Sequence, residues 1–357
     1  MTEVVAEVAP VLPPPPKMNP DGVVYSVQIA LGRGFARTAE VQANALLSAG
    51  LLANIFTGDS LAPDMPYRDI VFDAAVAAEL RRGKLFHGWN NGSLASIMRA
   101  KQLGMKTIVE RQSAHASVQK RLTGAVDSFS ERRMVLEYEL ADIILVPSNF
   151  VASSFYEYPE LKPKVRKITL GVDITRFKRT ASFKHPFRLL FIAQNFDRKG
   201  GVHLLKAWQS ARRQSKTVRD GALWVVGEAP LGNLGQGVNA LGWLDEDTFT
   251  RTIQDSDALV LPSLEEGFGL VVLEAMAAGK PVILSENVGA KDCIADGREG
   301  YIVPVGNHIS LARAITAMAN SSNRRLEMAE QAHRTACRYS WEKYVASYLE
   351  LVKGLLQ

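Results

Sequence analysis

Short apolar runs alternate with longer amphipathic stretches along most of the chain. In the first half the runs predicted as strands are residues 23–30, 51–57, 84–88 and 105–110. The stretches with helical spacing of apolar residues are 38–49 and 93–103, followed by a polar helical stretch over 115–139. Strands that alternate with helices in this way are typical of a parallel α/β sheet.

The alternation stops near residues 171–180 and then begins again. The second half predicts strands over 187–192, 223–226, 258–261 and 282–284, and helices over 201–212, 247–254 and 270–278. Residues 141–148 (ADIILVPS) and 256–263 (SDALVLPS) resemble each other, either by chance or because two Rossmann-like halves face a cleft. Since ligands of such sheets bind beyond the carboxyl ends of the strands, the cleft is the expected site.

Length and pattern together predict two domains behind a short leader. At about 150 residues per domain, 357 residues suffice for roughly two. Residues 1–20 contain four consecutive prolines and read as a flexible leader without a secretory pattern. The predicted domains are residues 21–178 and 179–339, and an amphipathic helix follows over 340–357.

Composition excludes several classes of protein. Hydrophobic residues make up 47% and charged residues 22%, as in globular enzymes and unlike disordered chains. No apolar stretch reaches the roughly 20 residues that a membrane span needs. Two cysteines, Cys293 and Cys337, exclude a disulfide framework and suit the cytoplasm. The net charge is +5, with 22 Lys and Arg against 18 Asp and Glu in residues 1–180, too small a surplus to predict a nucleic-acid partner.

Two carboxylates stand at the start of the helix predicted over 270–278. Glu266 lies in the loop before it, and Glu274 lies more than one turn inside. A helix N-terminus offers unpaired amides to an anion such as a diphosphate, and Gly267 and Gly269 allow close backbone approach. Alternatively, Glu266 only complements the helix dipole and Glu274 is solvated.

A second polar loop follows the strand predicted over 187–192. It carries Arg198 and Lys199 and opens a helix at about residue 201. Two adjacent cations at such a loop can neutralise a diphosphate leaving group, or they are solvated loop charges.

Together the two segments resemble the retaining glycosyltransferases of family 4, the group 1 enzymes of the GT-B fold. The resemblance extends to residues 171–177 (GVDITRF), 137–142 (EYELAD) and 339–342 (YSWE). Residues 32–34 (GRG) followed by 46–57 resemble a bacterial subset that builds surface polysaccharides. The fold implied is α/β, GT-B, with two Rossmann-like doubly wound domains facing a cleft and the last helix crossing back to the first domain.

The resemblance also implies residue roles. Glu274 would hold the ribose hydroxyls, Lys199 and Arg198 the diphosphate, and Glu266 the sugar hydroxyls beside the anomeric carbon. The further implied donor-binding residues are Gly267, Phe268, Gly269 and Leu270 at the helix start and Gly34 from the first domain. The family places a histidine near the reaction centre, which His115 matches unless it is a helix-capping or surface residue. His87 is either an acceptor-cleft residue or a plain loop histidine. The chain departs from the family at Ala193-Gln194, where a Gly-Arg pair is usual, and this leaves Arg198 as the substitute cation.

The activity implied is transfer of a sugar, with retention, from a UDP or GDP sugar to a hydroxyl acceptor, a glycan or a lipid-linked saccharide in surface polysaccharide synthesis. No cofactor is expected, and no metal, because Asp255-Ser256-Asp257 precedes its strand at the wrong end for a ligand. The N-terminal positive surplus motivates peripheral contact with an anionic membrane at its inner face. A nucleotide-sugar epimerase and a catalytically weak nucleotide-binding scaffold subunit stay open as alternatives.

Overall fold

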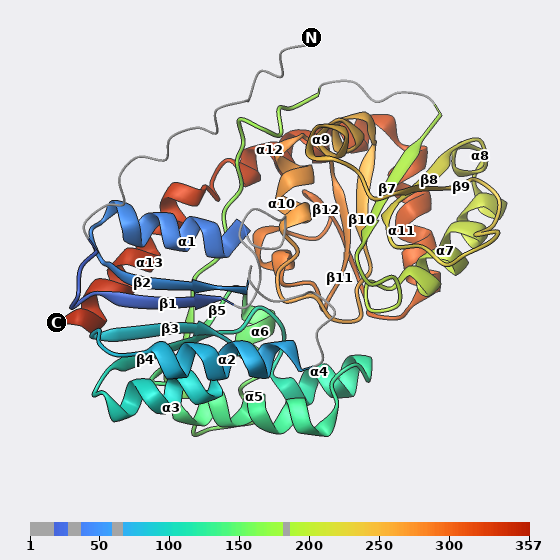
Figure 1. Cartoon of the computed structure of the whole chain (residues 1–357). Coiled ribbons are helices and arrows are strands. Elements are labelled where there is room, and N and C mark those ends of the chain that lie inside the picture. Colours follow the sequence, from blue (N-terminus) through green and yellow to red (C-terminus); the bar gives the residue numbers. More distant parts are fainter. Residues whose placement is uncertain (1–17, 28–36, 59–66, 181–185) are drawn as a thin grey trace, which may run out of the picture.

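Two parallel β-sheets form the framework of the protein (Figure 1). The computed structural model describes residues 18–27, 37–58, 67–180 and 186–357. Within these residues each sheet has six strands, in the orders β2-β1-β3-β4-β5-β6 and β12-β11-β10-β7-β8-β9. The second order runs outward in both directions from β7, as in a doubly wound Rossmann sheet. The predicted fold class is confirmed.

The first sheet is covered by helices on both faces. Its strands are β1 (Val23–Val27), β2 (Leu52–Thr57), β3 (Leu85–Trp89), β4 (Lys106–Glu110), β5 (Ile143–Val146) and β6 (Val165–Lys167). The helices before the second domain are α1 (Arg37–Ser48), α2 (Arg68–Glu79), α3 (Leu94–Gln102), α4 (Ala116–Thr123), α5 (Ser128–Leu140), α6 (Asn149–Ser153) and the short η3 (Lys162–Lys164). Successive residues such as Val23 and Val24 join different core clusters, so both faces of the sheet are buried.

The second sheet has the same layered construction. Its strands are β7 (Arg188–Ala193), β8 (Ala222–Gly227), β9 (Val238–Gly242), β10 (Ala258–Leu261), β11 (Val282–Ser285) and β12 (Gly300–Val303). Its helices are α7 (Gly201–Gln214), α8 (Lys216–Arg219), α9 (Glu246–Asp255), α10 (Leu270–Ala277), η4 (Gly289–Cys293), α11 (His308–Asn320) and α12 (Ser322–Ala336). The chain ends in α13 (Trp341–Leu356).

The polar stretch predicted as one helix over 115–139 is two helices instead. Gly124 ends α4 in the left-handed conformation, with φ of 66°. Asp127 then starts α5, since its side chain accepts hydrogen bonds from the amides of Phe129 and Ser130. The two similar segments, around β5 and β10, occupy different positions in their sheets. β10 is next to β7, the first strand of its sheet in the chain, whereas β5 lies three strands away from β1, the first strand of the other sheet.

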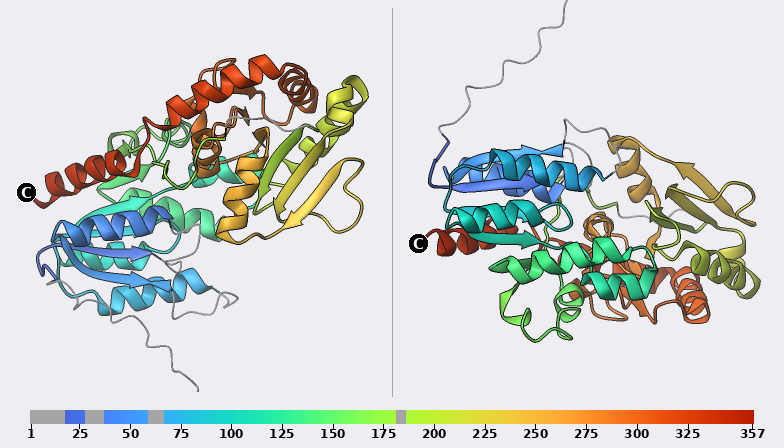
Figure 2. Two further views of the ribbon diagram at one scale, coloured as in Figure 1. Left: turned by 90° about the horizontal axis from the view of Figure 1, so that it is seen from above. Right: turned by 60° about the horizontal axis from the view of Figure 1, so that its bottom comes forward.

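The last helix, α13, packs against the first sheet although it follows the second domain (Figure 2). Tyr344 Oη accepts a hydrogen bond of 2.6 Å from Gln42 of α1, and Tyr348 Oη lies 2.8 Å from His87 Nδ1 of β3. Where the chain leaves α12, the amide of Val172 donates to the backbone oxygen of Tyr339 at 3.0 Å. The two chain crossings between the domains therefore run side by side.

None of the described helices is both long enough and apolar enough to cross a bilayer.

Candidate active site

A cleft of about 690 Å³ lies between the two domains. Both domains contribute to its walls: Arg37, Trp89 and Gln112 come from the first domain, and Lys199, Glu266 and Glu274 from the second. The 171–177 crossing and Trp341 at the start of α13 complete its lining. The pocket therefore sits beyond the carboxyl ends of the strands, where sheets of this kind bind ligands.

The N-terminus of α10 faces this cleft. Gly269 is the residue before the helix, with φ of 88° and no side-chain cap, so the first helical amides are left without a capping side chain. Phe268, Gly269 and Leu270 all line the cleft. Uncapped amides and the helix dipole favour an anion at this position.

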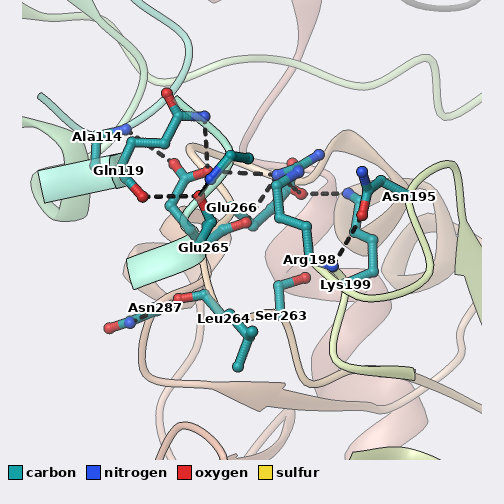
Figure 3. Close-up of polar contacts among 12 residues, drawn as sticks. Ala114, Gln119, Asn195, Arg198, Lys199, Ser263, Leu264, Glu265, Glu266 and Asn287 are labelled. Carbon is teal, nitrogen blue, oxygen red and sulfur yellow. Dashed lines mark hydrogen bonds and ion pairs between the residues drawn. The ribbon is translucent and has the colours of Figure 1, made fainter. Parts of the chain in front are cut away.

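Glu266 is held by two cations from the loop after β7. Lys199 Nζ forms an ion pair with Glu266 Oε2, and Arg198 Nη1 lies 3.3 Å from the same oxygen (Figure 3). Burial raises the pKa of Glu266, but the charges of Lys199 and Arg198 outweigh it and hold the pKa below its usual range. At neutral pH the loops after β7 and β10 thus bring together two cations and an ionised carboxylate, all of them largely buried.

Glu274 contrasts with Glu266 in having no hydrogen-bond donor among the described residues. It lies in α10 and lines the cleft. Burial raises its pKa to about 7, although the positive charges of Arg176 and Arg37 lower it in part. A half-buried carboxylate without a donor is ready to accept hydrogen bonds from a ligand's hydroxyl groups.

Two chain segments meet closely at the base of the cleft. A Cβ built on Gly267 would lie 1.7 Å from the backbone oxygen of Gln112 in the opposite domain. Ser148 Oγ, which also caps α6, donates a hydrogen bond of 2.6 Å to the backbone oxygen of Gly267. Gly267 does not itself line the cleft, so its lack of a side chain serves the contact between the domains, and its predicted role in donor binding stays a prediction.

The structure does not bring His115 into the cleft. Its side chain is fully buried, stacks on Tyr158 at 3.8 Å between ring centroids, and caps α4 through the amide of Ser117. Burial lowers its pKa to about 4, so the imidazole is neutral at physiological pH. His115 is therefore a helix-capping residue, which was the alternative to a place near the reaction centre.

Two other predicted residues have different outcomes. Gly34 lies outside the described residues, so its position relative to the cleft stays a prediction. His87 is not a loop residue: it lies within β3, fully buried, with Nε2 3.2 Å from Glu110 Oε2. Ala193 and Gln194 do line the cleft, where the family's Gly-Arg pair was expected.

Sequence reasoning missed Glu265 and Gln112. Glu265 is fully buried beside Arg198, and Gln112 lines the cleft. A carboxylate directly beside Glu266 was the one available signal for Glu265. Gln112 had no such signal, because its place depends on how the two domains meet.

Comparison with known proteins agrees with this geometry. Residues 173–335, which include Arg198, Lys199, Glu266 and Glu274, match the family model described as glycosyl transferases group 1. A D-inositol 3-phosphate glycosyltransferase of Corynebacterium urealyticum is 24% identical over 331 residues, 82% of this chain and 77% of that protein. A phosphatidyl-myo-inositol mannosyltransferase of Mycobacterium leprae is 31% identical over 111 residues, 31% of this chain and 30% of that protein.

Solved structures share the fold. Sucrose-phosphate synthase from Thermosynechococcus elongatus superposes with a TM-score of 0.75 at 19% identity, covering 94% of this chain and 99% of that one. Anabaena HepE in complex with UDP gives a TM-score of 0.70 at 16% identity, over 93% and 100% of the two chains. The second domain thus carries the sequence match to the group 1 glycosyltransferases, and the whole chain shares its fold with these solved structures.

Proposed function

We propose that this glycosyltransferase moves a sugar from a nucleoside diphosphate sugar to a hydroxyl acceptor with retention of anomeric configuration. The observation that carries the proposal is the cluster of Arg198, Lys199 and Glu266 beside the uncapped N-terminus of α10. Lys199, Glu266 and the start of α10 line a cleft large enough for a nucleotide sugar, and Arg198 contacts Glu266. Such a site stabilises the charge that develops on a departing diphosphate.

In the proposed reaction the acceptor oxygen forms a bond to the anomeric carbon while the bond from that carbon to the diphosphate oxygen breaks. The acceptor's proton passes to the departing phosphate, whose negative charge meets Lys199, Arg198 and the amides at Leu270. Retention follows when the acceptor attacks from the face that the leaving group occupies. Glu266 orients the donor sugar through its hydroxyls and keeps the two cations in place.

Glu274 is proposed to hold the ribose. Its carboxylate has no hydrogen-bond donor among the described residues, and two ribose hydroxyls are suitable donors. The base then lies toward Trp243 and Leu244, which line the same cleft after β9. UDP is the first candidate, since HepE has been solved with UDP and with UDP-glucose.

The proposed chemistry uses no metal and no cofactor. The charge that a metal would neutralise is met by Arg198, Lys199 and the helix N-terminus. Across residues 18–27, 37–58, 67–180 and 186–357, no three His, Cys, Asp or Glu side chains gather as ion ligands. Asp257 stands at the start of β10, away from the cleft, and accepts a hydrogen bond from the amide of Arg188.

The acceptor is proposed to be a glycan or a lipid-linked saccharide of bacterial surface polysaccharide synthesis, reached from the cytoplasm at the inner membrane face. Residues 1–180 carry most of the positive surplus of the chain, which suits an anionic surface. Sedimentation with vesicles of phosphatidylglycerol and phosphatidylcholine at low salt tests the membrane contact. Equal recovery with pure phosphatidylcholine vesicles would count against it.

The first experiment is thermal unfolding with UDP, GDP, ADP or NAD, each in EDTA. A ligand at one hundred times its dissociation constant adds about 2.7 kcal/mol to the free energy of unfolding, which raises the melting temperature by several degrees. A shift with one nucleoside diphosphate supports the proposal and identifies the donor's base. A shift with NAD alone, or with none of the four, contradicts it.

Incubation with the matching nucleotide sugar then separates the activities. Transfer in EDTA to an added glycan, with the anomeric proton coupling of the product equal to that of the donor, supports a retaining transferase without a metal. Donor isomerised in the absence of acceptor indicates an epimerase. Nucleotide binding without turnover on any acceptor indicates a scaffold subunit.

A further inference from the structure

Glu265 is a fully buried carboxylate that the proposed chemistry does not use. It directly precedes Glu266 in the loop after β10, and its side chain reaches Ala114 and Gln119 of the first domain (Figure 3). Burying a carboxylate is costly unless several donors compensate it. The residues that donate hydrogen bonds to this carboxylate therefore show which parts of the protein it connects.

Those donors come from both domains. The amide of Ala114 donates to Glu265 Oε1 at 2.9 Å, and Gln119 Nε2 of α4 lies 3.5 Å from Oε2. From the second domain, Arg198 Nη1 lies 3.4 Å from Oε2 and donates to the backbone oxygen of Glu265 at 2.8 Å. One carboxylate thus connects the segment before α4 to a cation of the proposed diphosphate site (Figure 3).

Arg198 is held on several sides at once. Its guanidinium contacts Glu265 and Glu266, while its amide donates to Asn195 Oδ1 at 2.9 Å and its backbone oxygen accepts from Leu264 at 2.9 Å. Lys199, in contrast, has its ion pair with Glu266 and none with Glu265. Removal of the Glu265 charge is therefore expected to affect Arg198 more than Lys199.

We propose that Glu265 is a positioning residue that uses donors of the first domain to fix Arg198 for the donor diphosphate. With the domains in contact, Ala114 and Gln119 hold the carboxylate, and the carboxylate holds the guanidinium beside Glu266. When the domains separate, the carboxylate loses both donors and the guanidinium loses its fixed support. This inference rests on the proposed function and adds a link from domain contact to diphosphate binding.

Two variants of Glu265 test the link. Glu265→Gln keeps the shape of the side chain and removes its charge. Glu265→Asp keeps the charge and shortens the reach, so it carries the test if the first variant unfolds. Glu299→Gln is the matched control, since Glu299 is a buried carboxylate far from the cleft that accepts from the amide of Ala295 at 2.9 Å and lies 3.4 Å from Arg298 Nε.

The readout is the affinity for UDP relative to uridine, with GDP against guanosine as a second pair. This preference reports the diphosphate contacts and needs no acceptor. We expect Glu265→Gln to reduce it about tenfold to a hundredfold, the effect of a misplaced charged group, whereas Glu299→Gln leaves it unchanged. The double variant Arg198→Ala/Glu265→Gln should lose no more than Arg198→Ala alone, because both changes remove the same contact.

Hydrogen exchange at the amide of Ala114 supplies a second measurement. UDP should slow this exchange in the wild-type protein and leave it unaltered in Glu265→Gln. If Glu265→Gln prefers UDP over uridine as strongly as the wild-type protein does, or if the losses in the double variant add, the positioning role of Glu265 is refuted. The proposed function is unaffected by either outcome. If the wild-type protein binds neither diphosphate more tightly than its nucleoside, the proposed function falls together with the inference.

Discussion

Ser148 Oγ of the first domain donates a hydrogen bond of 2.6 Å to the backbone oxygen of Gly267 in the second. The Gly267 carbonyl can accept this bond because the residue has no side chain: a Cβ would lie 1.7 Å from the backbone oxygen of Gln112. Contact between the domains at the loop before α10 thus depends on the lack of a side chain at Gly267.

Gly267→Ala is therefore expected to push the domains apart. Overpacking of this kind costs about 1 to 3 kcal/mol of stability, and transfer should fall at least tenfold. Thermal unfolding and the rate of sugar transfer measure the two effects. Gly354→Ala is the control, because nothing lies within 4 Å of the added methyl group and alanine favours the helix. Equal behaviour of the two variants would refute the tight contact.

Glu274→Gln should stabilise the free protein at pH 8 and weaken nucleotide binding. The folded-state pKa of Glu274 is raised to about 7, so the folded protein binds this proton more tightly than the unfolded chain. Its contribution to stability is therefore present below the unfolded pKa and lost as the pH rises to 7. We expect a gain of about 1 to 3 kcal/mol at pH 8 and little change at pH 4.

Urea unfolding of wild-type and variant at both pH values measures this difference. The affinity for the nucleoside diphosphate should fall about tenfold in Glu274→Gln, because a neutral amide is a weaker acceptor for the ribose than a carboxylate. A variant that binds nucleotide as tightly as the wild-type protein excludes Glu274 from the ribose site.

Lys199→Ala should lower kcat/KM for the donor by about a hundredfold or more, since it removes a charge that faces the leaving group. It should also change the pH profile. The charge of Lys199 lowers the pKa of Glu266 more than that of Arg198 does. Loss of Lys199 therefore raises this pKa and moves the acidic limb of the kcat/KM profile to higher pH. Lys206→Ala, at an exposed position of α7, should leave rate and profile unchanged.

Tyr348→Phe tests the attachment of α13 to the first sheet. The hydroxyl of Tyr348 lies 2.8 Å from His87 Nδ1, and both side chains are fully buried. Without the hydroxyl the imidazole nitrogen is left unpaired, at a cost of about 1 to 3 kcal/mol. Thermal unfolding measures the loss. Tyr156→Phe, with an exposed ring, should change the melting temperature little, and an equal drop in both variants would contradict the role of the hydroxyl.

The sequence alone determined most of the strands and helices, and it singled out the polar residues that gather near the start of α10. Periodicity placed β7, β10 and α10 within one or two residues, because buried strands and amphipathic helices depend on local spacing. Arg198, Lys199, Glu266 and Glu274 were found for the same reason: each pair belongs to one loop or one helix start, so its geometry is local.

Only the tertiary structure decided how residues far apart in the chain meet. His115 follows a strand as a catalytic histidine would, yet packing against Tyr138, Phe155 and Tyr158 buries it outside the cleft. The role of Glu265 depends on Ala114, 151 residues earlier, and that of His87 on Tyr348, 261 residues later. Such contacts follow from the packing of elements that are far apart in the chain, within the first domain as well as between the two domains, and no local pattern of hydrophobic and polar residues records them.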